Sequence, residues 1–145
     1  MKKSMIDEDG VDFLGMRLAI TLVATALLIG VASACVDNFM DGASRAKTRE
    51  EAGRIASLAE AEYASGCPGN DGGVPISVTI PRIARYVAFG GQGTYLIEFS
   101  DGSLETYAAD CRFSPATLYP GEHRLILETA NDNGTYLVKL TEGQG

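Results

Sequence analysis

The chain has 145 residues, of which 19 are Asp or Glu and 12 are Lys or Arg, so its formal net charge is −7. This acidic balance makes nucleic acid and anionic lipid headgroups poor partners. The length suits one small domain with a thin core beside an N-terminal apolar segment.

Residues 1–10 form a short polar leader that carries Lys2 and Lys3 together with three acidic residues. Residues 11–36 predict a transmembrane helix, because no charged residue lies between Leu18 and Val36. At about 1.5 Å per helical residue this run spans roughly 28 Å, close to the hydrocarbon thickness of a bilayer. It is longer than the apolar region of a secretory signal, which is usually about 7–15 residues. The lipid bilayer is therefore an expected partner, and a soluble cytoplasmic enzyme is the class that the sequence favours least.

Residues 37–65 predict an amphipathic helix that continues the apolar one. Apolar residues recur there at spacings of three and four, which gives one narrow stripe. The stripe comprises Phe39, Ala43, Ala46, Ala52, Ile55, Ala56, Ala59 and Tyr63. Gly66 and Pro68 end the helix. Since so narrow a stripe does not stabilise an isolated helix in water, we expect its part from Ala52 onward to pack on a β domain.

Residues 66–145 predict that domain, an antiparallel β domain of about six strands, so the fold class is α+β. The expected strands cover residues 76–80, 86–89, 94–100, 104–108, 124–129 and 135–141. Turn signals at Asp101-Gly102 and at residues 131–134 predict two hairpins. The candidate core residues are Ile76, Val78, Ile80, Tyr95, Ile97 and Phe99.

An internal similarity links residues 93–102 to residues 134–143, which both begin Gly-Thr-Tyr-Leu. Alternate positions of each copy fall on one face of a strand. Duplication of a strand pair and convergence on a common strand pattern both account for it.

Three cysteines are present, and Cys35 lies in the apolar helix, where it acts as a small apolar residue. Cys67 and Cys111 are the two outside it, and a pair of this kind in a small extracytoplasmic domain predicts a disulfide. Two free thiols are the alternative. Only His123 could join them in a zinc site, and neither cysteine has a close Cys or His neighbour.

The sequence contains no recognisable catalytic, metal or cofactor motif, so we expect neither an enzyme nor a cofactor. An enzyme with an unrecognised site is the remaining alternative. Acidic residues near turns suit either solvated loops or a surface calcium site, without the spacing of an EF-hand. These residues are Asp71, Asp101, Asp110, Glu122 and Asp132. Asn133 begins an Asn-Gly-Thr sequon at an expected hairpin tip, which makes it a candidate for N-glycosylation.

This order of charged leader, glycine, apolar helix, amphipathic helix and β domain resembles the type IV pilin superfamily, especially its archaeal pilin-like and archaellin-like members. The resemblance implies cleavage of the leader between Gly10 and Val11, packing of the helix in a filament core and exposure of the β domain on the filament surface. The chain departs from the pattern at Asp9, at Gly15, where bacterial pilins carry glutamate, and at Arg17 within the helix.

Two functions follow as expectations. The first is a pilin-like structural subunit, in a filament or as a minor pilin, whose partners are copies of itself or other pilin-like subunits. The second is a single-pass membrane-anchored ectodomain that does not polymerise and acts as a binding module. In both, the expected disulfide and sequon place residues 37–145 outside the cell, with the N-terminus in the cytoplasm.

Overall fold

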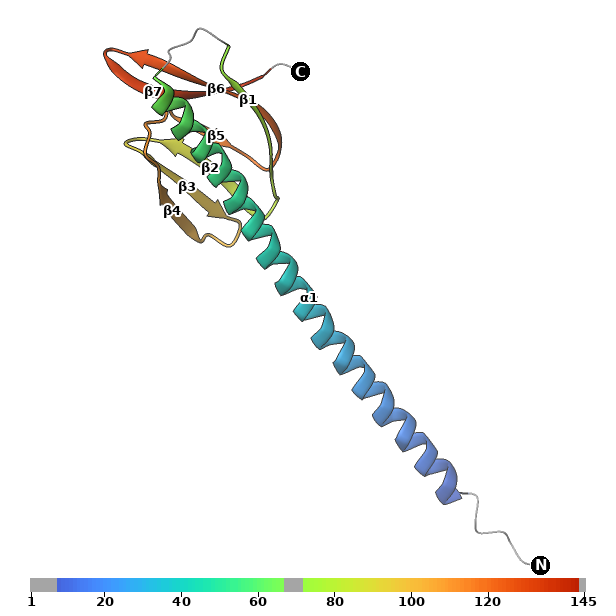
Figure 1. The fold of residues 1–145 in the computed structure, drawn as a ribbon. Coiled ribbons are helices and arrows are strands. Elements are labelled where there is room, and N and C mark those ends of the chain that lie inside the picture. Colours follow the sequence, from blue (N-terminus) through green and yellow to red (C-terminus); the bar gives the residue numbers. More distant parts are fainter. Residues whose placement is uncertain (1–7, 67–71, 144–145) are drawn as a thin grey trace, which may run out of the picture. The chain divides into compact units, whose positions relative to one another are not determined.

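The computed structural model describes residues 8–66 and 72–143. It contains one helix, α1 (Glu8–Ser65), followed by seven strands, β1 to β7, which confirms the α+β class (Figure 1). The chain divides into two compact units, residues 1–40 and residues 41–145, which are described separately below. Residues 67–71, which include Cys67, lie outside the described part.

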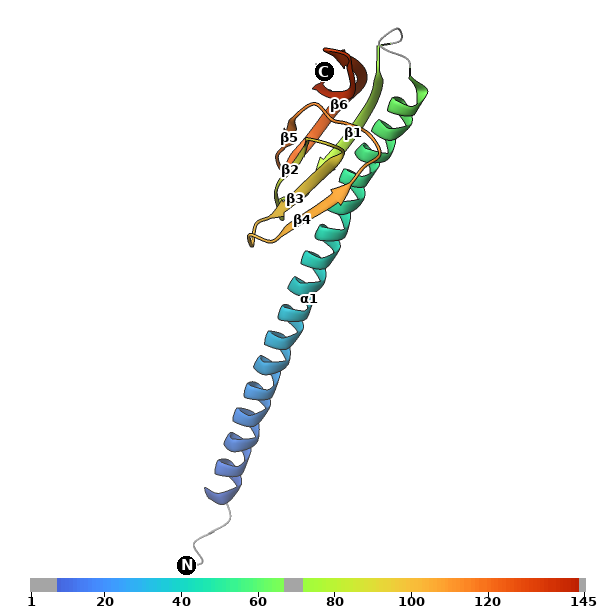
Figure 2. The same ribbon diagram turned by 90° about the vertical axis from the view of Figure 1, so that its left-hand side faces the viewer.

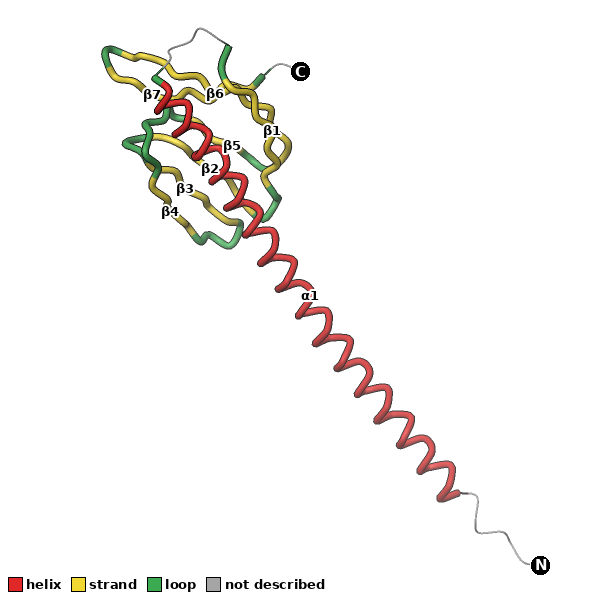
Figure 3. The backbone as a smooth tube through the Cα atoms, viewed as in Figure 1, coloured by secondary structure: helices red, strands yellow, loops and turns green. Residues whose placement is uncertain are grey.

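The second unit holds two antiparallel sheets. One has the strand order β1 (Val74–Ile80), β6 (Gly121–Asp132) and β7 (Thr135–Glu142). The other has the order β4 (Leu104–Ala108), β3 (Thr94–Phe99), β2 (Ala84–Gly90) and β5 (Ala116–Leu118). Figures 2 and 3 show these strands beside the C-terminal part of α1.

The core of this unit joins the helix to both sheets. Alternate residues of the strands point inward, as the period of two requires. All six candidate core residues are buried, and so are Ala52, Ile55, Ala56 and Ala59 of the helix. The helix therefore packs on the β domain as the sequence predicted.

The apolar stripe begins later than predicted. Phe39 is 74% exposed and Ala43 and Ala46 are exposed, whereas Thr48 is fully buried. The Thr48 hydroxyl donates a hydrogen bond to the Ser44 carbonyl at 2.9 Å, so its burial leaves no unpaired polar group. The buried side of the helix thus starts at Thr48, one turn before Ala52.

The sequence predicted six strands, and the structure has seven. The additional strand, β5, lies in the segment that Pro115 and Pro120 mark as a loop. It pairs with β2 through three residues only, and Leu118 fills a buried position. So short a pairing leaves no periodicity in the sequence.

The two similar segments lie in different sheets, one on β3 and the other on β7. Ile97 and its counterpart Val138 are both fully buried. Tyr95 is 8% exposed, whereas its counterpart Tyr136 is 47% exposed. The shared pattern thus places the middle of each strand in the core, while β7, at the edge of its sheet, exposes Tyr136.

Candidate functional site

The largest exposed apolar surface lies on α1 between Phe13 and Met40. Its large apolar side chains are between 57% and 74% exposed. They are Phe13, Leu14, Met16, Leu18, Ile20, Leu22, Val23, Leu27, Leu28, Ile29, Val31, Val36, Phe39 and Met40. By length and composition this helix can cross a membrane. Its apolar part is exposed throughout, so it is not the core helix of its own domain.

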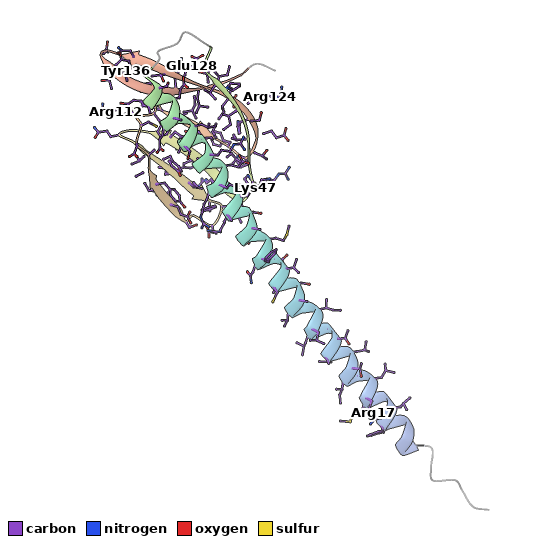
Figure 4. The ribbon with its side chains drawn as sticks, viewed as in Figure 1. Arg17, Lys47, Arg112, Arg124, Glu128 and Tyr136 are labelled. Carbon is purple, nitrogen blue, oxygen red and sulfur yellow. The ribbon has the colours of Figure 1, made fainter. Side chains whose placement is uncertain are left out.

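The hydroxyl groups of two threonines within this surface are paired along the helix. Thr21 donates to the Arg17 carbonyl and Thr25 donates to the Thr21 carbonyl, each at 2.8 Å. Such bonds to the preceding turn leave these threonines compatible with an apolar environment. The guanidinium of Arg17 lies 4.7 Å from the centre of the Phe13 ring, and Figure 4 labels Arg17 on this part of α1.

The predicted cleavage site lies at the beginning of the same helix. The backbone of Gly10 and Val11 is helical, within the first turn of α1. Their side-chain environments are outside the described part, so cleavage between them stays a prediction.

Two arginines tie the beginning of the second unit to the β3–β4 hairpin. Arg45 forms an ion pair with Asp101, and Arg49 donates two hydrogen bonds to Glu105, at 2.8 and 2.7 Å. Both guanidinium groups lie over the ring of Phe99, with their central carbons 4.4 and 5.9 Å from its centre. We call these five residues the arginine clamp. No sequence pattern indicates it, because each ion pair joins residues 56 positions apart.

The clamp lowers the pKa of both carboxyl groups. Hydrogen bonds from Ser103, together with Arg45, lower the pKa of Asp101 to about 2. Hydrogen bonds from Arg49 and Tyr107 lower the pKa of Glu105 to about 2. Asp101 therefore interacts with the Arg45 guanidinium and with Ser103 of its own turn. It does not belong to a cluster of acidic residues.

The acidic residues that suggested a surface calcium site do not come together. Asp101 belongs to the clamp, Glu122 and Asp132 lie at opposite ends of β6, and the Asp110 amide donates to Glu60 at 2.9 Å. Asp71 is outside the described residues. Within residues 8–66 and 72–143, no group of three His, Cys, Asp or Glu residues is arranged to hold a metal ion.

Cys111 lies in the core and near the end of α1. It is 3% exposed, and burial raises the pKa of its thiol to about 11. It lines a surface depression together with Tyr63, which precedes Cys67 by four residues. No disulfide is seen among the described residues, in which Cys111 and Cys35 carry free thiols. Because Cys67 lies outside them, the pairing of Cys67 with Cys111 stays a prediction.

Asn133 lies at the tip of the β6–β7 hairpin. It is exposed, and its φ of 49° is the left-handed conformation that Asn tolerates in tight turns. Gly134 follows with φ of 84°, and its amide donates to the Asn131 side chain at 2.9 Å. The sequon is therefore exposed at a hairpin tip as expected, and its modification stays a prediction.

His123 is one of the residues that line a surface cavity of about 530 Å³ formed by β1, β6 and β7. Its Nδ1 atom lies 2.8 Å from a Glu142 carboxylate oxygen, and its Nε2 atom lies 2.6 Å from the Tyr119 carbonyl oxygen. Both ring nitrogens are thus engaged. The other side chains lining the cavity include Ser77, Thr79, Glu122 and Arg124.

No protein family, curated protein or solved structure matches this chain. The layout, a long apolar N-terminal helix followed by antiparallel sheets, is compatible with pilin-like folds.

Proposed function

We propose that the protein is a type IV pilin-like structural subunit, anchored in the membrane by α1 and assembled with copies of itself or other pilin-like subunits through the same helix. The observation that carries this proposal is the exposed apolar surface of α1 from Phe13 to Met40. Its uncharged run, from Leu18 to Val36, extends roughly 28 Å at about 1.5 Å per residue.

The uncharged run from Leu18 to Val36 matches a hydrocarbon core of about 30 Å, and Arg17 and Asp37 at its two ends would reach the headgroup region. A bilayer therefore covers this run in either function. Phe39 and Met40 follow Asp37 and are 74% and 58% exposed, beyond that run. Packing against other helices would cover them, which favours assembly over the non-polymerising alternative.

The second unit is suited to the outer face of the membrane in this proposal. Its small core is the kind that a disulfide between Cys67 and Cys111 would stabilise, and its exposed sequon would be glycosylated only in an extracytoplasmic location. We therefore assign the N-terminus to the cytoplasm and residues 37–145 to the outside.

The mass of the mature chain tests the proposal. A pilin-like subunit purified from its native membrane should begin at Val11, with the ten leader residues removed. A Gly10→Leu variant is the matched control, because a bulky residue before the cut should block processing and leave the full-length mass. A wild-type chain that keeps its leader would contradict the pilin-like assignment and favour the stand-alone anchor.

Orientation is tested separately by labelling with a membrane-impermeant thiol reagent. A cysteine placed at Thr106, which is exposed on β4, should react in intact cells when Cys35 is replaced by serine. Reaction only after the membrane is broken would contradict the assigned orientation.

A further inference from the structure

His123 is the only histidine of the chain, and it lies where the chain passes from one sheet to the other. It is the third residue of β6 and follows the β5–β6 loop, residues 119–120, which connects the two sheets. Its side chain is 14% exposed and lines the surface cavity described above. The ring is therefore held by its surroundings and still exchanges protons with solvent.

Both nitrogens of the His123 ring face hydrogen-bond acceptors. The Nδ1 atom lies 2.8 Å from a carboxylate oxygen of Glu142, the last residue of β7, and the Nε2 atom lies 2.6 Å from the Tyr119 carbonyl oxygen. A neutral imidazole has one N–H group, so it donates one of these bonds and the other contact brings two lone pairs together. The imidazolium has two N–H groups and donates both bonds. The two acceptors therefore match the protonated ring.

Of the charged groups around the ring, Glu142 is the one in direct contact. Glu122 and Arg124, the neighbours of His123 on β6, line the same cavity, but side chains alternate along a strand, so theirs lie on its other face. Their charges are also of opposite sign. From β1 the ring meets Val78 and Thr79, which are uncharged.

Two other ionisable groups leave this picture unchanged. The β5–β6 loop adds the phenol of Tyr119, and a phenol is uncharged at neutral pH. A protonated Glu142 would be the other way to satisfy Nδ1. Imidazole is a stronger base than a carboxylate, so the proton between the two belongs to the ring.

We propose that His123 is a pH-dependent lock, which in its protonated form joins the β5–β6 loop to the end of β7. When the ring becomes neutral, Nδ1 loses its proton to solvent and the bond to Glu142 is lost. This bond is the one that breaks because the Glu142 side chain is 71% exposed and can turn into water. The Tyr119 acceptor is a backbone carbonyl, and it stays in place because β6 begins two residues later.

The end of β7 is the part that the lock controls. β7 lies at the edge of its sheet, and directly after it the Gly143 amide donates to the Arg124 carbonyl at 2.7 Å. Release of the Glu142 side chain lets this backbone bond open more often. The end of β7 is therefore held in acid and released as the pH rises through the range of about pH 5 to 8, in which histidine loses its charge. The lock is independent of assembly through α1 and goes beyond the proposed function.

Amide hydrogen exchange tests the lock at Gly143, measured by NMR on the full chain in detergent. The quantity compared is the protection factor, which is the intrinsic exchange rate of an amide at a given pH divided by its observed rate. For Gly143 it should be about threefold to fivefold higher at about pH 5.5 than at about pH 8, since solvent screens the exposed Glu142. The Val138 amide, in the middle of the same strand, donates to the Arg112 carbonyl and shows whether the domain is folded.

Two variants should abolish this difference at Gly143. His123→Gln removes the titrating ring. In Glu142→Gln the side-chain amide can turn to offer either its oxygen or its N–H group, so it accommodates both forms of the ring. Glu122→Gln makes the same change on the other face of β6, so it is the matched control and should keep the difference.

Equal protection of Gly143 at the two pH values in the wild type would overturn the lock. A difference that persists in His123→Gln would overturn it as well, because the difference would then come from another group. If His123→Gln left Val138 unprotected, Glu142→Gln would decide alone, since an exposed side chain tolerates this change. None of these outcomes depends on whether α1 assembles, so failure of the lock and failure of the proposed function are distinguishable.

Discussion

At the scale of single residues, the arginine clamp explains how the first turns of the helix in the second unit are held. Arg45 and Arg49 combine ion pairs to Asp101 and Glu105 with stacking on Phe99. Exposed ion pairs contribute little individually, about 0–1 kcal/mol, but planar guanidinium groups with two parallel hydrogen bonds hold a defined geometry.

Glu105→Gln tests the clamp through pH. The pKa of Glu105 is lowered, so its contribution is present above the ordinary carboxyl pKa and is lost as the pH falls toward about 2. The variant should be less stable than the wild type by about 1 kcal/mol at pH 7, since solvent screens the pair. This difference should shrink between pH 5 and about pH 2 in urea unfolding of the full chain in detergent. Glu50→Gln, at an exposed position, is the control; a difference that is constant with pH would contradict the role of Glu105.

Gly93, like Gly73, is a glycine at which a positive φ coincides with a close approach of other atoms. Its φ is 76°, and a Cβ atom there would lie 2.6 Å from the Ala109 carbonyl oxygen. Gly102 has a similar φ of 84° with no atom within 4 Å of its Cβ position. Gly102→Ala should cost about 1 kcal/mol from the backbone alone, and Gly93→Ala should cost clearly more. Equal unfolding midpoints for the two variants would show that the close contact with the Ala109 carbonyl does not lower the stability of the Gly93 variant.

At the scale of elements, the order and type of most elements follow from the sequence. The helix was predictable from its uncharged run and its three-and-four spacing, and the two hairpins from Asp101-Gly102 and residues 131–134. The exposure of the apolar helix followed from the same run. Three features were not predictable, because each depends on tertiary contacts: strand β5, the start of the buried stripe at Thr48 and the arginine clamp.

The packing of the helix on the sheets predicts the effect of Ile55→Asp. Ile55 is fully buried, so an unpaired carboxylate there should cost several kcal/mol and unfold much of the second unit. Ser57→Asp, at an exposed position two residues later, is the matched control and should change stability by less than about 0.5 kcal/mol. The melting temperature of each variant is measured by following the β-sheet signal in circular dichroism during heating. Equal melting temperatures would contradict the packing of this helix face.

The predicted disulfide belongs to the same scale, because it would join the end of α1 to the segment after β4. Closing that loop should stabilise the domain by up to about 4 kcal/mol. Intact-mass measurement after alkylation of the denatured, unreduced chain should find one modified cysteine, Cys35. Modification of all three cysteines would show that Cys67 and Cys111 are free thiols.

At the scale of the whole molecule, the two units differ in the exposure of their apolar residues. The second unit buries its own core, with helix and both sheets contributing. The first unit exposes an apolar surface that its own chain leaves uncovered in residues 13–40. A surface of this size requires lipid, other subunits or both to cover it.

Sedimentation of material sheared from the cell surface without detergent tests most directly whether α1 assembles with other subunits. The expected result is large assemblies built from chains that begin at Val11. The contrary result is a chain that stays in the membrane pellet, dissolves only in detergent and then sediments as a monomer. That result would identify α1 as an anchor alone.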